Sequence, residues 1–171
     1  MSDKILVAYA TAAGSTGEVA EAIGEALRDE STAVDVRRAK EVTDLSGYRA
    51  VVVGSGVRAG RVYKDAMAFL GTHQQALGQV PVAYFVVCLT MKDDTEESRR
   101  TAGTYADQMR EKAPQVQPVD VALFGGVMDC SKLSLPLKLM MKLMKSPEGD
   151  FRDSEAIRAW ATGVRPMLLG V

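Results

Sequence analysis

The sequence predicts an α/β domain with a three-layer, doubly wound fold, in which helices cover both faces of a five-stranded parallel sheet. Two observations lead to this fold class. Short, continuously apolar runs recur along the chain, as in strands that are buried on both faces. Between these runs, apolar residues are spaced three or four apart, as in helices that cover a sheet. Strands that alternate with helices form right-handed βαβ units and hence a parallel sheet.

Five segments have the character of strands. The second alternates only weakly between apolar and polar residues, which is typical of an edge strand, and the fourth is the most apolar. The predicted strands are residues 5–9, 33–37, 50–54, 82–88 and 119–124.

Four segments have helical spacing: one that follows the loop of residues 11–17 and includes Val19, Ile23, Ala26 and Leu27, residues 61–76, a charged segment that begins after Thr95, and residues 156–169. Thr95 is the expected N-cap of the third helix, and Glu96 and Glu97 suit the positive end of its dipole. Pro166 is expected to fray the end of the last helix, because proline has no backbone N–H to donate.

The numbers of charged and metal-binding residues exclude two classes of function. The 171 residues include 21 Lys or Arg and 22 Asp or Glu, for a net charge of −1, whereas a nucleic-acid-binding protein carries a basic excess. His73 is the only histidine, and Cys88 and Cys130 form no C-x-x-C pair, so histidine-rich and paired-cysteine zinc sites are excluded. We expect one domain over residues 1–171, with no metal site and no nucleic-acid partner.

We expect a cytoplasmic protein. The first residues lead directly into an apolar strand without the pattern of a signal peptide, and the cysteine usage fits a reducing compartment. The longest apolar run, residues 80–89, is shorter than the roughly 20 residues that a membrane-spanning helix needs. Any membrane contact is therefore expected to be peripheral.

The loop after the first strand has the composition of an anion site. Residues 11–17 carry three hydroxyls and two glycines, with no charge and no bulky side chain. The amides of a first helical turn point toward such an anion, and hydroxyls donate further hydrogen bonds. The candidate ligands are Thr11, Ala12, Ala13, Gly14, Ser15 and Thr16.

A second interpretation of this loop needs no ligand. Ser15 and Glu18 form the S-x-x-E pattern of a helix capping box. The loop has no lysine and no G-x-G-x-x-G, so it is neither a nucleoside triphosphate loop nor a dinucleotide fingerprint. The G-x-G-x-x-x-G of residues 54–60 has the wrong spacing and follows the wrong strand for that fingerprint.

The pattern T-x-x-G-S-T-G at residues 11–17 resembles the phosphate loop of flavodoxin-like proteins, which bind flavin mononucleotide (FMN) with hydroxyls and backbone amides. The resemblance covers roughly residues 4–161. It implies FMN as the cofactor and a strand order of 2-1-3-4-5. It also implies that the chemistry takes place on the flavin, so that no side chain of this chain is a catalytic residue.

Two further loops resemble the flavin-flanking loops of that family. The first, after the third strand, would place Ser55, Gly56, Val57, Arg58 and Ala59 beside the isoalloxazine ring. The second, after the fourth strand, would contribute Cys88, Leu89 and Thr90, with Met91 either as a lid over the ring or as a packing residue.

Arg58 is the one charged residue in these loops. A guanidinium beside the N1 and C2 carbonyl side of the ring stabilises the negative charge of reduced flavin, so Arg58 is a candidate for tuning the flavin potential. The alternative is a solvated surface arginine.

A segment rich in leucine, methionine and lysine, at about residues 131–146, is predicted as a helical insertion between the fifth strand and the last helix. Lys138, Lys142 and Lys145 lie at i, i+4 and i+7, which would place them on one side of a broadly apolar helix. Residues 132–145 therefore fit peripheral contact with a membrane surface, or a helix packed on the sheet whose lysines reach water.

Within the flavodoxin-like proteins, the sequence resembles the menaquinone-dependent protoporphyrinogen oxidase branch. The resemblance rests on the turn after the third strand and on the inserted segment. It implies an FMN-dependent oxidoreductase of heme biosynthesis with a quinone as acceptor. Residues 128–132 depart from that branch because they contain no aromatic residue.

Two alternative functions remain open. A flavodoxin-type electron carrier would dock on a redox partner protein, although such carriers are commonly acidic and this chain is nearly neutral. A domain that binds no flavin would serve as an interaction module. The sequence does not indicate an oligomeric state.

Overall fold

The computed structural model describes residues 4–12, 14–128, 135–143 and 149–170. Five parallel strands form the main sheet in the order β2-β1-β3-β5-β6, which confirms the predicted strand order. They are β1 (Lys4–Ala10), β2 (Val34–Arg38), β3 (Tyr48–Arg58), β5 (Val82–Cys88) and β6 (Val121–Gly125).

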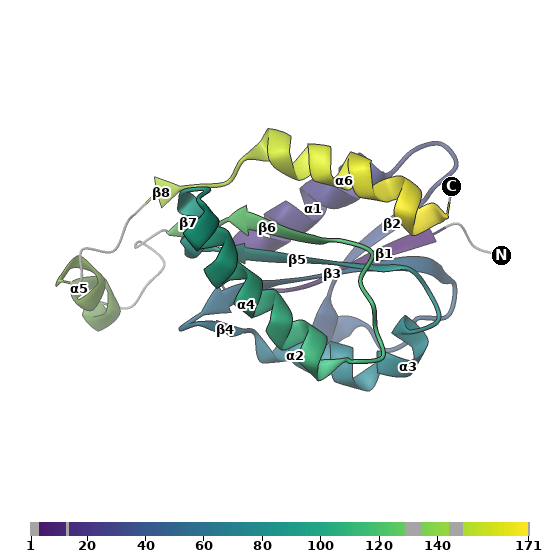
Figure 1. The fold of residues 1–171 in the computed structure, drawn as a ribbon, viewed down its shortest axis with the longest axis horizontal. Helices are drawn as coiled ribbons and strands as arrows, with labels where there is room; N and C mark the ends of the chain where they lie inside the picture. The colour runs from purple at the N-terminus through teal and green to yellow at the C-terminus, as the bar shows by residue number, and fades with distance from the viewer. Residues whose placement is uncertain (1–3, 13, 129–134, 144–148, 171) are drawn as a thin grey trace.

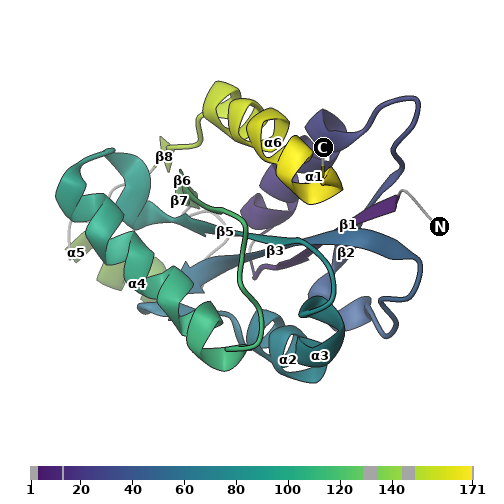
Figure 2. The same cartoon turned by 45° about the vertical axis from the view of Figure 1, so that its right-hand side comes forward.

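Helices cover both faces of this sheet, as predicted (Figures 1 and 2). On one face lie α1 (Ser15–Leu27) and α6 (Ser154–Leu169), and on the other lie α2 (Lys64–Thr72), α3 (Gln74–Leu77) and α4 (Glu96–Lys112). Two short 3-10 helices, η1 (Ala39–Glu41) and η2 (Leu89–Lys92), follow β2 and β5.

Successive residues of each central strand belong to different cores. Ile5 and Val7 of β1 pack in the core beneath α1 and α6, whereas Leu6 and Ala8 pack in the core beneath α2 and α4. All seven residues of β5 are buried. A strand between two helical layers needs apolar side chains on both faces, which explains the unbroken apolar runs in the sequence.

The segment predicted as one helix over residues 61–76 differs from that prediction. Arg61 and Val62 form β4, which pairs antiparallel with the end of β3, and the helical part divides at His73 into α2 and α3. Tyr63 has extended backbone and precedes the first helical residue. The pairing with β4 also lengthens β3 to Arg58, four residues beyond the predicted end.

The two helix ends that the sequence singled out differ in outcome. Thr95 caps α4 as predicted, since its Oγ1 accepts a hydrogen bond of 3.0 Å from the Ser98 N–H. The expectation for Pro166 was wrong, because α6 continues to Leu169 and ends at Gly170 in the left-handed region. Leu168 and Leu169 are buried in the core, and their packing holds this last turn in place.

The insertion begins and ends in a short antiparallel ribbon formed by β7 (Val127–Met128) and β8 (Gly149–Asp150). The ribbon follows β6, so the insertion leaves the body at the edge where the parallel strands end. Helix α5 (Leu135–Leu143) stands apart from the two helical layers on that side, opposite the two termini (Figure 1). None of the described helices is long and apolar enough to span a membrane.

Candidate flavin site

The carboxyl ends of β1, β3 and β5 meet at one edge of the sheet, where doubly wound folds bind their ligands. β1 leads there into the loop before α1, β3 into a hairpin with β4, and β5 into η2. The three loops that the sequence singled out therefore lie at the same edge.

The first loop is folded by its own hydroxyl. Thr11 Oγ1 accepts a hydrogen bond of 3.0 Å from the Gly14 N–H, and its hydroxyl proton can still be donated to a ligand. Gly14 has φ 94°, a conformation that glycine adopts at little cost, and α1 begins at the next residue. Ala12 is exposed, Ser15 is half-buried and Thr16 is buried, while Ala13 lies outside the described residues.

The capping-box interpretation of this loop was wrong. Gly14 is the N-cap of α1 and no side chain accepts a hydrogen bond at that position. The Glu18 carboxylate instead binds the Arg152 guanidinium. The first-turn amides of α1 and the Ser15 hydroxyl therefore face an edge where no capping side chain competes with an anion.

The second loop is mostly strand. Ser55 and Gly56 pair with Val86 and Val87 of β5, and the chain reverses only after Arg58. Ser55 is fully buried: its Oγ donates to the Gly56 carbonyl at 2.7 Å and accepts from the Tyr63 N–H at 3.1 Å. The Ser55 side chain thus joins β3 to the start of α2.

Gly56 is the point where the first two loops meet. A Cβ at this position would lie 2.9 Å from Thr16 Oγ1 and 2.8 Å from Tyr63 Cε2. Both distances are shorter than a Cβ tolerates, so any side chain here would displace α1 or the Tyr63 ring. The absence of a side chain at Gly56 lets the candidate phosphate loop lie directly against β3.

The tip of the β3–β4 hairpin carries the candidate tuning residue. Ala59 and Gly60 both have positive φ, 52° and 75°, and form the turn. Val57 is half-buried and Arg58 is exposed on the strand leading into it. Burial raises the pKa of Tyr63, and the positive charge of Arg58 opposes that rise, so the guanidinium lies within electrostatic range of the phenol.

The third loop, at the end of β5, is buried or half-buried. Burial raises the pKa of the Cys88 thiol, which disfavours its reactive thiolate form. Leu89 and Thr90 are half-buried, with Thr90 Oγ1 3.4 Å from the Tyr105 hydroxyl. Met91 is buried in the core, which agrees with its interpretation as a packing residue and not as a lid over the ring.

Sequence reasoning missed Arg152. Its guanidinium donates to both carboxylate oxygens of Asp150, at 2.9 and 2.7 Å, and also to Glu18. These hydrogen bonds lower the pKa of Asp150 to about 2. Arg152 thus joins the base of the insertion to the first turn of α1. No local pattern reveals this contact, because 134 residues separate Glu18 from Arg152.

The family model of the flavodoxin domain matches residues 6–155. The chain belongs to the flavodoxin domain family. Among relatives, protoporphyrinogen IX dehydrogenase (quinone) of Escherichia coli is 23% identical over 153 residues, which cover 88% of this chain and 83% of that protein. An NAD(P)H dehydrogenase (quinone) of Paraburkholderia phymatum is 33% identical over 89 residues, or 39% of this chain and 45% of that protein.

Solved flavodoxin structures share the fold over nearly the whole chain. A flavodoxin from the Archaea has a TM-score of 0.58 and 19% identity, and the match covers 96% of this chain and 98% of that one. Oxidised flavodoxin 2 of Bacillus cereus has a TM-score of 0.58 and 17% identity, with 98% and 97% covered.

This family membership implies FMN as the cofactor, and the residues at the edge fit it. A phosphate requires amides and hydroxyls that are not already paired. The Gly14 amide is bound by Thr11 Oγ1, but no side chain caps the first turn of α1, so the amides of that turn remain available. The Arg152 guanidinium, which is shared with Asp150, offsets part of the negative charge of Glu18, the acidic residue of the first turn that would repel a phosphate dianion.

We predict that replacing Arg152 weakens FMN binding. In R152M, the Glu18 carboxylate loses its partner beside the bound phosphate. Because Glu18 is largely exposed, the repulsion is screened, and we expect the dissociation constant to rise about 2- to 5-fold. Quenching of flavin fluorescence at low salt measures this constant.

The matched control is R165M, which removes another partly buried arginine that pairs with Asp29 beyond the far end of α1. R165M should leave FMN affinity unchanged, and E18Q/R152M should restore it. Unchanged affinity in R152M, or no recovery in E18Q/R152M, would contradict the prediction.

Proposed function

We propose that this protein is an FMN-dependent oxidoreductase of the protoporphyrinogen oxidase type, which delivers electrons from a reduced substrate to a quinone. The names of its relatives support quinone chemistry. The observation that carries the proposal is an apolar helix, α5, inserted at the same sheet edge as the candidate flavin loops.

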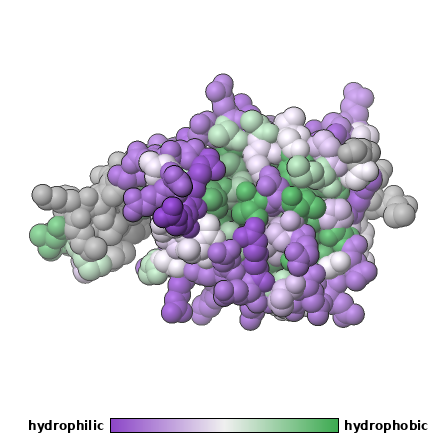
Figure 3. Space-filling view, in the orientation of Figure 1, coloured by the Kyte–Doolittle hydropathy of each residue, from purple (hydrophilic) through white to green (hydrophobic). Residues whose placement is uncertain are grey.

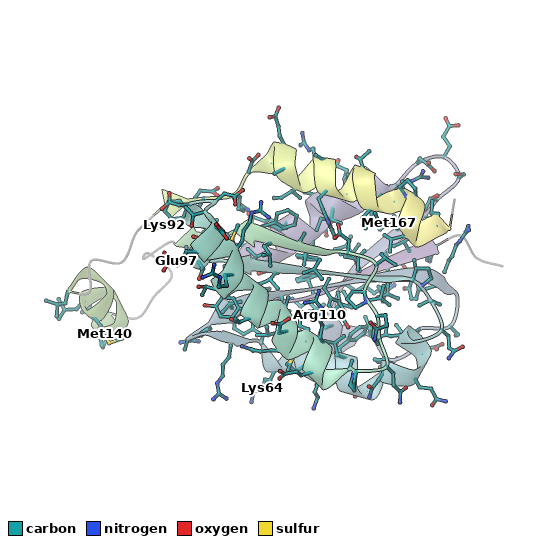
Figure 4. The ribbon with its side chains drawn as sticks, viewed as in Figure 1. Lys64, Lys92, Glu97, Arg110, Met140 and Met167 are labelled. Carbon is teal, nitrogen blue, oxygen red and sulfur yellow. The ribbon has the colours of Figure 1, made fainter. Side chains whose placement is uncertain are left out.

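Helix α5 exposes a row of leucines. Leu135, Leu139 and Leu143 are 80%, 63% and 78% exposed, and their spacing of four places them along one side of the helix. Full burial of a leucine contributes roughly 2 kcal/mol, and most of this contribution is absent at each of these positions. The described side chains of α5 form a green group at the left end of Figure 3, and Met140 projects there in Figure 4. Such a surface suits a flat apolar substrate or the lipid that carries it.

Bound FMN supplies the redox chemistry, and the protein holds and shields it. The amides of the first turn of α1 and the hydroxyls of Thr11, Ser15 and Thr16 would hold the phosphate. The backbone near Gly56 and Ala59 would bind the polar edge of the ring, with Val57 beside it, and Arg58 would supply a positive charge there. Leu89 and Thr90, which follow Cys88, would complete the site from the third loop.

A flavodoxin-type carrier is the second candidate function, since flavodoxins share the fold over nearly their full length. Diffusing carriers use a strong charge to steer toward partner proteins. The net charge of −1 and the exposed leucines of α5 both favour the enzyme.

The proposed function is tested by reduction and reoxidation of the flavin. The protein is loaded with FMN, reduced anaerobically, and mixed with a menaquinone analogue while the oxidised-flavin absorbance is followed. We expect the quinone to reoxidise the reduced flavin. We also expect protoporphyrinogen IX to reduce the oxidised flavin faster than NAD(P)H does. Reoxidation by an electron-accepting protein but not by the quinone would establish the carrier function instead, and absence of a flavin band after FMN titration would overturn both.

Arg58 is predicted to bind the reduced cofactor better than the oxidised one. In R58A we expect the affinity for reduced FMN, relative to oxidised FMN, to fall about 3- to 5-fold, which corresponds to the roughly 1 kcal/mol of an exposed charge pair. A potentiometric titration measures this ratio. R61A is the control, because Arg61 lies opposite Arg58 on the same hairpin. If R58A gives the same flavin potential as the unmodified protein, or if R61A shifts the potential as much as R58A does, Arg58 has no specific tuning role.

The proposal extends to peripheral contact with an anionic membrane surface through residues 132–145. The exposed leucines of α5 would insert at the lipid interface, and the sequence adds four lysines, Lys132, Lys138, Lys142 and Lys145, of which the first and last lie outside the described residues. An apolar helix with several cations binds such interfaces.

We predict that the protein floats with vesicles containing anionic lipid at low salt. L135S/L139S/L143S should remain at the bottom of the gradient, because the apolar contribution to binding is lost. M167S, which removes an exposed methionine of α6 far from the insertion, should float normally (Figure 4). Failure of the unmodified protein to float at low salt would refute the membrane contact.

A further inference from the structure

The side-chain amide of Gln108, on α4, spans the turn of the β3–β4 hairpin. Its Nε2 donates a hydrogen bond of 2.9 Å to the Gly60 carbonyl, and its Oε1 accepts one of 3.0 Å from the Val62 N–H. Gln108 is half-buried between the helix and the hairpin. Gly60 belongs to the turn and Val62 to the returning strand, so the side-chain nitrogen and oxygen of Gln108 both bind the hairpin.

The hairpin depends on such an anchor. Only two residue pairs, Val57 with Val62 and Arg58 with Arg61, join β3 to β4. A ribbon this short is marginal by itself, and its turn contains the left-handed Ala59. Two hydrogen bonds from one planar amide fix both the distance of the turn from α4 and its orientation.

A second anchor holds the hairpin at its base. Ser55 Oγ accepts from the Tyr63 N–H, so the chain is fixed just before and just after the hairpin. Arg58 lies between the two anchors. Among the described residues Arg58 forms no ion pair, and its guanidinium is therefore placed by the hairpin backbone.

We propose that Gln108 is a positioning residue for the flavin site. It does not touch the cofactor; it holds the hairpin so that Arg58 and the backbone at Ala59 keep a fixed place beside the ring. The inference rests on the proposed function, since it needs FMN at this edge. It adds a residue from α4, whose sequence position gives no sign of a role in flavin binding.

The test combines Gln108 and Arg58 in one double-mutant cycle on the FMN-loaded protein. Q108L has nearly the same size but makes neither hydrogen bond. We expect Q108L to lower the relative affinity for reduced FMN about 2- to 5-fold, in the same direction as R58A. The double variant R58A/Q108L should show no further loss beyond R58A, because Gln108 acts through Arg58.

D107N is the matched control. It alters the neighbouring residue of α4, whose carboxylate pairs only with Arg110 among the described residues, and should leave the flavin potential unchanged. Q108E is the second variant if Q108L does not fold, because its carboxylate still accepts from Val62 but cannot donate to Gly60.

A measurement on the protein without FMN separates this inference from the proposed function. Hydrogen exchange of the Val62 amide should be faster in Q108L than in D107N, since its acceptor is lost. Two results would overturn the proposal, namely Val62 exchange that does not change, or a flavin potential that stays the same in both Gln108 variants while FMN remains bound. Failure of the unmodified protein to bind FMN would refute the proposed function, whereas the Val62 measurement would stand.

Discussion

Burial of both faces of a parallel sheet is the constraint on which this molecule depends. It requires buried and mostly apolar residues along the central strands, most completely in β5, and crossovers that connect one parallel strand to the next. The carboxyl ends of all the strands then lie at one edge, because the crossovers return the chain to the opposite edge. Three loops that are distant in sequence meet at that edge for this reason alone, before any side chain in them makes a specific contact.

Close contacts between these loops depend on small residues and on side-chain hydrogen bonds. Gly56 lets β3 approach α1, and Ser55 joins β3 to the start of α2. Arg152 connects the base of the insertion to α1, and Gln108 connects the hairpin to α4. Three of these four contacts are thus made by the side chains of Ser55, Gln108 and Arg152, and the fourth depends on the absence of a side chain at Gly56.

The sequence predicted the fold well and the site only in part. Apolar runs, together with the weak alternation of the second segment, identified all five parallel strands, and Thr95 capped α4 as its hydroxyl predicted. The prediction of a capping box at Ser15 was wrong. Gly14, not Ser15, is the N-cap of α1, and the Glu18 carboxylate binds Arg152. The helix predicted from residue 61 failed at its start, because β3 supplies a pairing partner for β4 that helical spacing does not reveal.

The sequence by itself determined the layers and the uncharged loop before α1, because these depend on local composition and periodicity. The strand order was implied by the family resemblance. Only the tertiary structure decided which polar groups remain available to a ligand. The Thr11 hydroxyl accepts a hydrogen bond within its own loop, the Ser55 hydroxyl donates one to the Gly56 carbonyl, and Glu18 pairs with an arginine 134 residues away. Hydrogen bonds between distant segments are set by how the layers pack, so no local pattern contains them.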